Sequence, residues 1–377
     1  MIYLDYAATT PVPRAVADAM LAVLTDGFGN PSAQYPLGRE AHALVERCRK
    51  TLADALGCES RQFVFTSCGT ESDNFALRLA AYQNRHVGRH IITTAVEHSA
   101  VLEPCHQLEQ EGWQVTYLKP DRNGNITVGQ VADALREDTA LVSVMLVNNE
   151  TGCVFPVREI AELLRARSSR ALLHTDAVQG FLKLPFTASS LGADLISVSG
   201  HKLGAPKGVG GLYLSARIRA PRPLIAGGGQ EMGLRSGTEA TAQIAGFAKA
   251  VELYAAHAEE HRASMISVKE YALQKISALD GVVRIGDGAA PHVLSLSLVG
   301  YPSANVVSDL GAQGICISAG SACHRGKTSH VYAAMGLDKK TAAGVLRISF
   351  GPETTRAEID AFVRALKAHR DTRFPML

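Results

Sequence analysis

One lysine carries the strongest chemical signal in the sequence. Residues 197–208 read SVSGHKLGAPKG and place Lys202 shortly after an expected buried strand, among small residues and glycines. Burial at the end of a strand lowers the pKa of a lysine and favours the neutral amine that forms Schiff bases, and glycines leave room for a bulky cofactor. A GHK triplet alone is more often a solvated turn, so the neighbouring motifs decide between the two interpretations.

Two other motifs also follow expected strands. Asp176, within the sequence HTDAVQ, supplies a carboxylate of the kind that keeps a pyridinium nitrogen protonated and makes the ring an electron sink. Residues 66–72 read TSCGTES and run through small residues into a helix, whose first N–H groups can bind a phosphate. Separately, Asp176 could be a helix cap and Thr70 an N-cap. Together with Lys202, these motifs favour a site for a pyridine ring that carries a phosphate.

Cys323 is the candidate nucleophile. It follows a short expected strand in a Gly- and Ser-rich segment, where a thiolate could approach a substrate and then withdraw. Burial as a structural thiol is the commoner fate of a cysteine. We assign that structural role to five other cysteines, which are Cys48, Cys68, Cys105, Cys153 and Cys316.

Composition limits the class of protein. The chain has 377 residues, which is enough for two or three domains, and its 46% hydrophobic and 20% charged residues exclude wholesale disorder. The 38 Lys+Arg and 36 Asp+Glu residues give a net charge of +2, which argues against nucleic acid or an anionic membrane as a partner.

The seven cysteines include no CxxC pair and no zinc-ligand spacing, so we expect no metal site and a cytoplasmic location. We expect neither a targeting segment nor a membrane-spanning helix, because no window approaches the 18 or so apolar residues of a span.

The elements that must position these residues alternate in type. Short β-branched apolar runs lie between helical stretches, a pattern typical of an α/β protein with a mainly parallel sheet. The expected strands are residues 63–66, 90–94, 114–118, 140–146, 171–175, 195–199 and 210–214, and the expected helices between and before them are residues 14–24, 38–56, 71–83, 128–136 and 157–167.

The pattern changes in the last third of the chain. A long loop at 219–237 and one helix from about 239 to 279 precede a smaller α+β domain. The strict alternation in 293–298 predicts a half-buried strand there. Two further strands are expected at 315–318 and 345–350, followed by a closing helix.

Ten motifs, in chain order, carry a family resemblance that spans nearly the whole chain. They are YLDYAATT (3–10), GNPS (29–32), TSCGTESDN (66–74), EH (97–98), VNNETG (147–152), HTDAVQG (174–180), SGHK (199–202), LRSGTE (234–239), SAGSAC (318–323) and RIS (347–349). The sequence resembles the cysteine desulfurases of the NifS/IscS type, which are class V members of the fold-type I pyridoxal 5'-phosphate (PLP) enzymes. The resemblance implies an α/β fold with a large domain, built on a mainly parallel seven-stranded sheet, and a small α+β domain. We assign the large PLP-binding domain to residues 14–255 and the small domain, which carries the catalytic cysteine, to residues 1–13 and 256–377.

The resemblance also implies a role for each matching residue. Lys202 would hold PLP covalently and later remove the α-proton of L-cysteine, while His98 would stack on the ring and assist proton transfer. Cys323 would take the substrate sulfur as a persulfide, leaving L-alanine. The remaining expected contacts are Gly69, Thr70, Ser199 and His201 with the phosphate, Asp176 and Gln179 with the ring, Asn149 with cofactor and substrate, and Arg347 with the substrate carboxylate, which a guanidinium grips bidentately.

The resemblance implies protein partners as well. Thr238, in the RSGT motif, would reach the phosphate bound by a neighbouring subunit, so a homodimer is expected. The sulfur acceptor would be a protein such as an iron–sulfur scaffold or a tRNA-thiolation enzyme. Only residues 324–328 separate Cys323 from the SHV motif at 329–331, fewer than in relatives with long loops. The alternatives are a selenocysteine lyase, another class V PLP enzyme such as an aminotransferase, or a non-catalytic sulfur-relay or scaffold protein. The complete set of site residues argues against the last of these, the non-catalytic protein.

Overall fold

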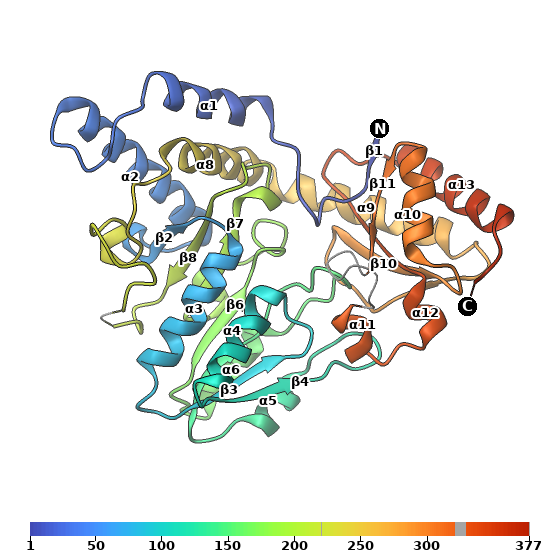
Figure 1. Ribbon diagram of the computed structural model, residues 1–377, viewed down its shortest axis with the longest axis horizontal. Coiled ribbons are helices and arrows are strands. Elements are labelled where there is room, and N and C mark those ends of the chain that lie inside the picture. The colour runs from blue at the N-terminus through green and yellow to red at the C-terminus, as the bar shows by residue number, and fades with distance from the viewer. Residues whose placement is uncertain (220, 321–328, 377) are drawn as a thin grey trace.

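The computed structural model describes residues 1–219, 221–320 and 329–376 (Figure 1). The predicted nucleophile, Cys323, lies outside the described residues. No helix within the described residues is long and apolar enough to cross a membrane.

A seven-stranded sheet forms the centre of the larger part of the molecule. Its strands are β2 (Phe63–Thr66), β3 (His90–Thr94), β4 (Gln114–Leu118), β5 (Thr139–Ser143), β6 (Leu172–Asp176), β7 (Leu195–Ser199) and β8 (Gly210–Leu214). The order across the sheet is β2-β8-β7-β6-β5-β3-β4, and only β8 runs antiparallel to its neighbours. The predicted mainly parallel sheet of seven strands is confirmed.

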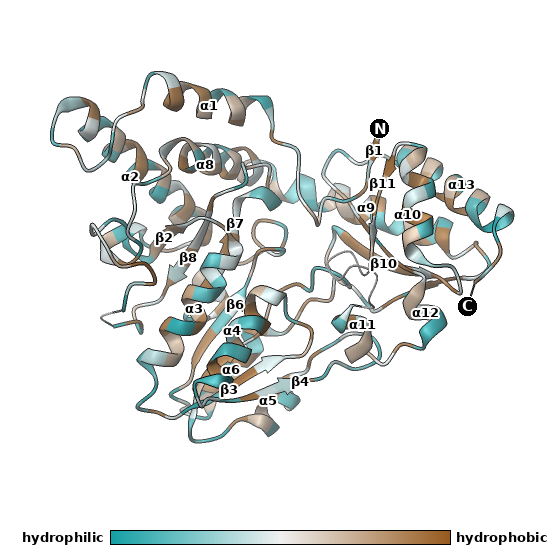
Figure 2. Cartoon of the chain, viewed as in Figure 1, coloured by the Kyte–Doolittle hydropathy of each residue, from teal (hydrophilic) through white to brown (hydrophobic). Residues whose placement is uncertain are grey.

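Helices cover both faces of this sheet because its strands are apolar on both sides. Val64 and Leu141 share one buried cluster with Phe75, whereas Phe65 and Val142 belong to the cluster on the opposite face. Figure 2 shows the same inward concentration of apolar residues. The helices of this part are α1 (Arg14–Thr25), α2 (Pro36–Leu56), α3 (Gly69–Gln83), α4 (Ser99–Gln110), α5 (Val128–Ala134), α6 (Val157–Ala166), α7 (Ala188–Leu191) and α8 (Thr241–Ala255).

The single long helix predicted for residues 239–279 is wrong. The chain forms α8 (Thr241–Ala255) and a separate helix α9 (Ala258–Ile276). The break lies at His257, whose φ of −128° and ψ of 20° are not helical. Apolar spacing continues through both helices, so the pattern alone does not reveal the change of direction.

A second sheet lies in the C-terminal part. Its order is β12 (Ser318–Ala319), β13 (Val345–Ser349), β10 (Val293–Leu298) and β9 (Val282–Arg284), with antiparallel pairing throughout. Two short strands, β1 (Ile2–Tyr3) and β11 (Ile315–Cys316), pair in parallel beside it. The surrounding helices are α9, α10 (Ser303–Ala312), α11 (His330–Ala334), α12 (Lys339–Ala343) and α13 (Arg356–Thr372).

The expectation that β10 is half-buried is also wrong, because all six of its residues are buried. Its serines are accommodated by hydrogen bonds: Ser295 Oγ lies 3.1 Å from the Tyr332 hydroxyl, and Ser297 Oγ donates to the Thr341 carbonyl at 2.6 Å. A buried hydroxyl is tolerated when it has such a partner.

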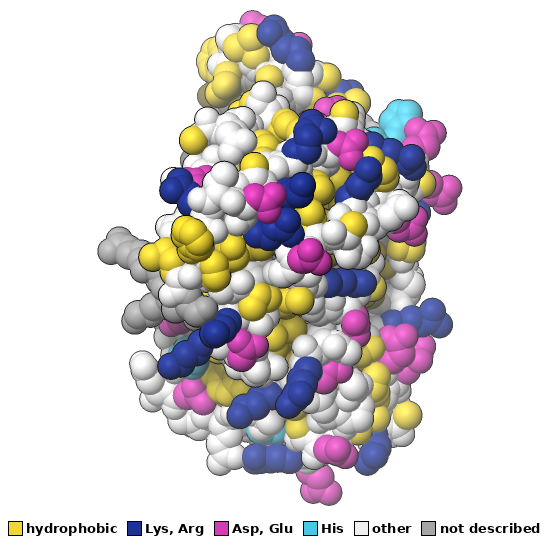
Figure 3. Space-filling model, turned by 90° about the vertical axis from the view of Figure 1, so that its right-hand side faces the viewer, with side chains coloured by type: hydrophobic (Ala, Val, Ile, Leu, Met, Phe, Trp, Pro, Cys, Tyr) yellow, Lys and Arg dark blue, Asp and Glu magenta, His cyan; other side chains and the backbone are white. Residues whose placement is uncertain are grey.

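The N-terminal segment joins the two sheets. It begins beside β11, forms a parallel bridge between Asp5 and Ser349 at the end of β13, and continues toward α1 (Figure 1). The face of the C-terminal part seen in Figure 3 carries basic and acidic side chains intermixed, in agreement with the net charge of +2. Our division into domains at residues 14–255, and at 1–13 with 256–377, remains a prediction.

Candidate active site

A cavity of about 380 Å³ opens where β6 and β7 end and where the C-terminal sheet approaches. Parallel strands present their carboxyl ends at one edge of a sheet, which is where ligands bind in open α/β folds. Ten of the predicted site residues line this cavity, namely Gly69, Thr70, His98, Asn149, Asp176, Gln179, Ser199, His201, Lys202 and Arg347.

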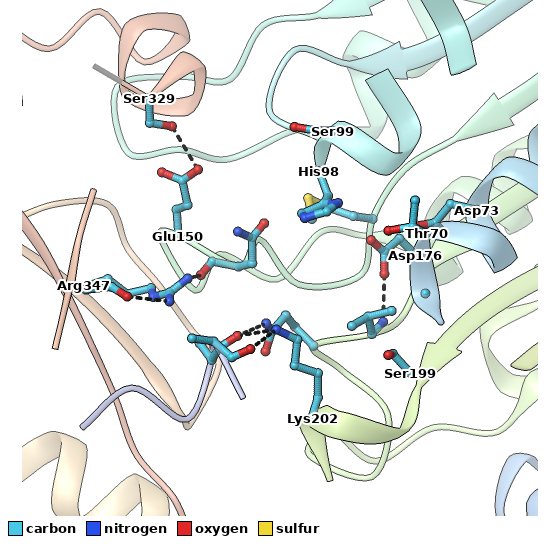
Figure 4. Close-up of a pocket in the computed structure, with 18 of the residues that line it drawn as sticks. Thr70, Asp73, His98, Ser99, Glu150, Asp176, Ser199, Lys202, Ser329 and Arg347 are labelled. Carbon is cyan, nitrogen blue, oxygen red and sulfur yellow. Dashed lines mark hydrogen bonds between the residues drawn. The ribbon is translucent and has the colours of Figure 1, made fainter. Parts of the chain in front are cut away.

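Lys202 ends the short 3₁₀ helix η2 (Gly200–Lys202), which follows β7 directly. Its Nζ donates to the carbonyl oxygens of Ala7 at 2.7 Å and Ala8 at 2.8 Å (Figure 4). The amine is therefore directed into the cavity, toward the N-terminal segment.

Asp176 is the last residue of β6 and is buried, with 6% of its surface exposed. Its Oδ1 accepts a hydrogen bond from the Val178 N–H at 2.8 Å. Burial, with the neighbouring Asp73 carboxyl adding repulsion, raises the pKa of Asp176 to about 7. A cationic ring nitrogen beside this group would favour its charged form.

Gln179 lies three residues further on, and protein groups engage both ends of its amide. Nε2 donates to the Ala7 carbonyl at 2.9 Å, and Oε1 lies 3.1 Å from His292 Nε2. These contacts hold the side chain at the cavity wall.

The start of α3 forms the end of the cavity suited to an anion. Its N-cap is Cys68, which makes no side-chain cap hydrogen bond, so the interpretation of Thr70 as a plain N-cap is wrong. Ser199 and His201 face the same region from the end of β7. Burial, then the positive charge of Lys202, lowers the pKa of His201 to about 4, which leaves a neutral imidazole at neutral pH.

Gly69 lines the cavity where the start of α3 packs closely against its neighbours. A Cβ placed on Gly69 would lie 2.9 Å from Val178 Cγ2 and 3.4 Å from Ser199 Cβ. The first of these distances is too short for carbon atoms in contact, so a side chain here would force its neighbours to move.

His98 is the N-cap of α4, and its Nδ1 accepts a hydrogen bond from the Ala100 N–H at 3.1 Å. An accepting Nδ1 places the proton of the neutral ring on Nε2. Burial, opposed by the nearby Asp176 carboxyl, lowers the pKa of His98 and favours this neutral form.

Arg347, from β13, lies at the other end of the cavity. Its Nη1 donates to the Asn149 carbonyl at 3.0 Å, and its Nη2 donates to Asp5 Oδ1 at 2.8 Å and to Ser318 Oγ at 3.1 Å. A guanidinium in this position can bind an anionic group of a ligand.

Asp73, one turn into α3, is a cavity residue to which the sequence analysis assigned no role. It is 1% exposed, and its Oδ1 lies 3.5 Å from Nε2 of the buried His174. Burial raises the pKa of Asp73 to about 7 and lowers that of His174 to about 4. The available signal was the position of Asp73 four residues after Gly69, which places both on the face of α3 that meets the cavity.

Thr238 does not line the main cavity. It borders a separate cavity of about 180 Å³, together with Ser67, Gly208 and Arg235. Arg235 Nε donates to Glu71 Oε1 at 2.9 Å, which connects this loop to the first turn of α3.

The cavity fits PLP on its own chemistry. A buried carboxyl suits the ring nitrogen, a lysine amine faces the centre, and an uncapped helix start with a nearby hydroxyl suits the phosphate. Asp176 and Ser199 end adjacent strands, Lys202 follows the second of them, and Gly69 lets the start of α3 pack closely at the same cavity.

Comparison with known proteins gives concordant results. The family model described as "Aminotransferase class-V" matches residues 2–362. The chain is 40% identical to "Putative cysteine desulfurase IscS 1" of Bacillus subtilis, an alignment that covers 95% of each protein. Among solved structures, a "NIFS-LIKE PROTEIN" has a TM-score of 0.92 at 34% identity and covers 99% of this chain and 100% of that one. The structure titled "SspA in complex with cysteine" has a TM-score of 0.82 at 35% identity, and the match covers 94% of this chain and 100% of that one.

Proposed function

Because the chain belongs to the aminotransferase class-V family, we propose that it is a PLP-dependent cysteine desulfurase, which converts L-cysteine into L-alanine and transfers the sulfur to a cysteine of its own. The observation that carries this proposal is the convergence of a lysine, a buried carboxyl, an uncapped helix start and an arginine on one cavity. The desulfurase names of relatives covered over nearly their whole length support the choice of reaction.

PLP, when bound, supplies an electron sink that makes the hydrogen on the substrate Cα acidic. In our proposal Lys202 holds it covalently, Asp176 and Gln179 contact the ring, and the phosphate occupies the start of α3. The phosphate contacts are Gly69, Thr70, Ser199 and His201, completed by Thr238 of the neighbouring subunit.

Binding and proton transfer fall to four residues. Arg347 binds the substrate carboxylate, with Asn149 beside it. Once Lys202 no longer holds the cofactor, its Nζ removes the proton from Cα of L-cysteine, since the amine faces the cavity. His98 stacks on the ring and, with its proton on Nε2, assists the later transfer of a proton to the product.

The sulfur transfer assigned to Cys323 balances in atoms and electrons. The bond between Cβ and sulfur of L-cysteine breaks and a sulfur–sulfur bond forms on Cys323 Sγ, while the proton that the Cys323 thiol gives up balances the one that Cβ gains as L-alanine forms. A thiolate is required because it is the nucleophilic form of the side chain.

The wider setting is also part of the proposal. We infer a homodimer in which Thr238 acts on the partner's site, and a sulfur-acceptor protein such as an iron–sulfur scaffold. A cytoplasmic location rests on the cysteine content alone.

The deciding experiment measures L-alanine and sulfide formed from L-cysteine with a thiol reductant present. The wild type and a Cys58→Ala control should form both products in equal amounts, while Cys323→Ala and Lys202→Ala should form neither. A wild type that binds PLP but forms neither product would reject the proposal, as would a Cys323→Ala variant with full activity. A kcat/KM for L-selenocysteine far above that for L-cysteine would favour a selenocysteine lyase instead.

A further inference from the structure

The guanidinium of Arg347 belongs to a closed set of hydrogen bonds with two residues from other segments. Nη2 donates to Asp5 Oδ1 at 2.8 Å and to Ser318 Oγ at 3.1 Å, and Ser318 Oγ donates to Asp5 Oδ2 at 2.8 Å. The side chains of Arg347 and Asp5 are only 12% and 17% exposed. Asp5 Oδ1 thus accepts from the guanidinium itself and Asp5 Oδ2 accepts from the serine that also contacts it, and together these bonds fix the orientation of the guanidinium.

The backbone around Asp5 is itself held in place. Ser349 N donates to the Leu4 carbonyl at 2.8 Å, and Ala7 N donates to Ser349 Oγ at 2.8 Å. The Tyr3 hydroxyl donates to the Asp5 carbonyl at 3.1 Å. The same segment supplies the carbonyl groups that accept from Lys202, so it has a fixed position relative to both ends of the cavity.

The hydrogen bonds determine which donors of Arg347 remain for a ligand. Both Nη2 hydrogens and one Nη1 hydrogen have acceptors, in Asp5, Ser318 and the Asn149 carbonyl. The Nε–H is buried and has no partner among the described residues. Arg347 lines the cavity, so a ligand carboxylate at that end would supply a further acceptor for this guanidinium.

We propose that Asp5 is a positioning residue that, together with Ser318, holds Arg347 in the orientation in which its remaining N–H groups bind the α-carboxylate of the substrate. This inference rests on the proposed function for the identity of the substrate. Asp5 itself does not line the cavity, whereas Ser318, Asn149 and Arg347 do. Its effect is therefore confined to ligands that carry a carboxylate.

The test compares two ligands that differ in that group. L-Alanine, the expected product, and L-alaninamide, which lacks the carboxylate, are titrated calorimetrically into the PLP-loaded enzyme. Asp5→Ala should raise the Kd of L-alanine about tenfold, because a hydrogen bond to a charged group is removed, and should change that of L-alaninamide less than about twofold. Asp5→Asn keeps an acceptor for Nη2, so its effect on L-alanine should be smaller.

The controls separate positioning from general damage. Asp18→Ala removes an acid of the same type that is exposed on α1 and pairs with Arg14, and it should change neither Kd. An unchanged Kd of L-alanine in Asp5→Ala, or an equal loss for both ligands, would overturn the proposal. If the wild type forms no L-alanine from L-cysteine while Asp5→Ala still weakens L-alanine selectively, the proposed function fails and the role of Asp5 stands.

Discussion

A buried ion pair between Arg49 of α2 and Glu231 anchors the loop that leads to Thr238. Arg49 Nη1 and Nη2 donate to the two carboxylate oxygens of Glu231 at 2.6 and 2.8 Å, and the side chains are 5% and 3% exposed. Glu231 Oε2 also accepts from the Phe65 N–H at 2.7 Å. Glu231 and Met232 adopt φ values of 48° and 58°, which non-glycine residues rarely adopt and which the ion pair helps to maintain.

Glu231→Ala should therefore be strongly destabilising. It removes both bonds to Arg49 and deprives the Phe65 N–H of its acceptor. The buried cation keeps the Phe63 carbonyl at 3.0 Å, and its remaining ion-pair partner among the described residues is the half-exposed Glu46 at 3.1 Å. Loss of one partner of a buried pair lowers the free energy of unfolding by about 3–5 kcal/mol. With a urea dependence of about 3 kcal/mol per molar, the unfolding midpoint should fall by about 1 M or more.

The measurement is urea unfolding at fixed protein and PLP concentrations, since ligand and subunit association also stabilise the native state. The matched control is Asp54→Ala, which breaks the exposed Lys50–Asp54 pair on the same helix, at 2.8 Å, and should lower the free energy of unfolding by no more than about 0.5 kcal/mol. The double variant Arg49→Met with Glu231→Met should recover much of the stability, because no uncompensated charge stays buried. A loss below about 1 kcal/mol in Glu231→Ala would refute this reasoning.

Two further predictions concern Gly69, which lines the cavity, and His174, which lies beside the cavity residue Asp73. Gly69→Val should raise the Kd of PLP at least about tenfold, measured by equilibrium dialysis, because the added carbon atoms overlap Val178. The control is Gly129→Ala, which should leave this Kd unchanged because the nearest atom to the added Cβ lies 3.8 Å away. Burial lowers the pKa of His174 to about 4, so between about pH 6.5 and 4 the unfolded chain binds a proton that the folded protein does not, and the free energy of unfolding falls as pH falls. Relative to His174→Gln, the wild type should lose stability over this range in urea unfolding at several pH values; a difference independent of pH would contradict the assignment.

The sequence by itself determined the elements whose signal is local. The seven central strands were predictable because each is a short run of apolar, often β-branched residues with helical spacing on either side. The cavity residues were also predictable, since Asp176, Ser199 and Lys202 lie at or just after strand ends, and the carboxyl ends of parallel strands meet at one edge.

The tertiary structure alone decided the contacts between segments far apart in the chain. Asp5 meets Arg347 across 342 positions, and Arg49 meets Glu231 across 182, and neither pairing has a signature in local spacing. The break at His257 and the complete burial of β10 were mispredicted for the same reason. Apolar periodicity indicates which residues are shielded from water. Where a helix changes direction, and whether one or both faces of a strand are buried, depends on the elements that pack against that helix or strand.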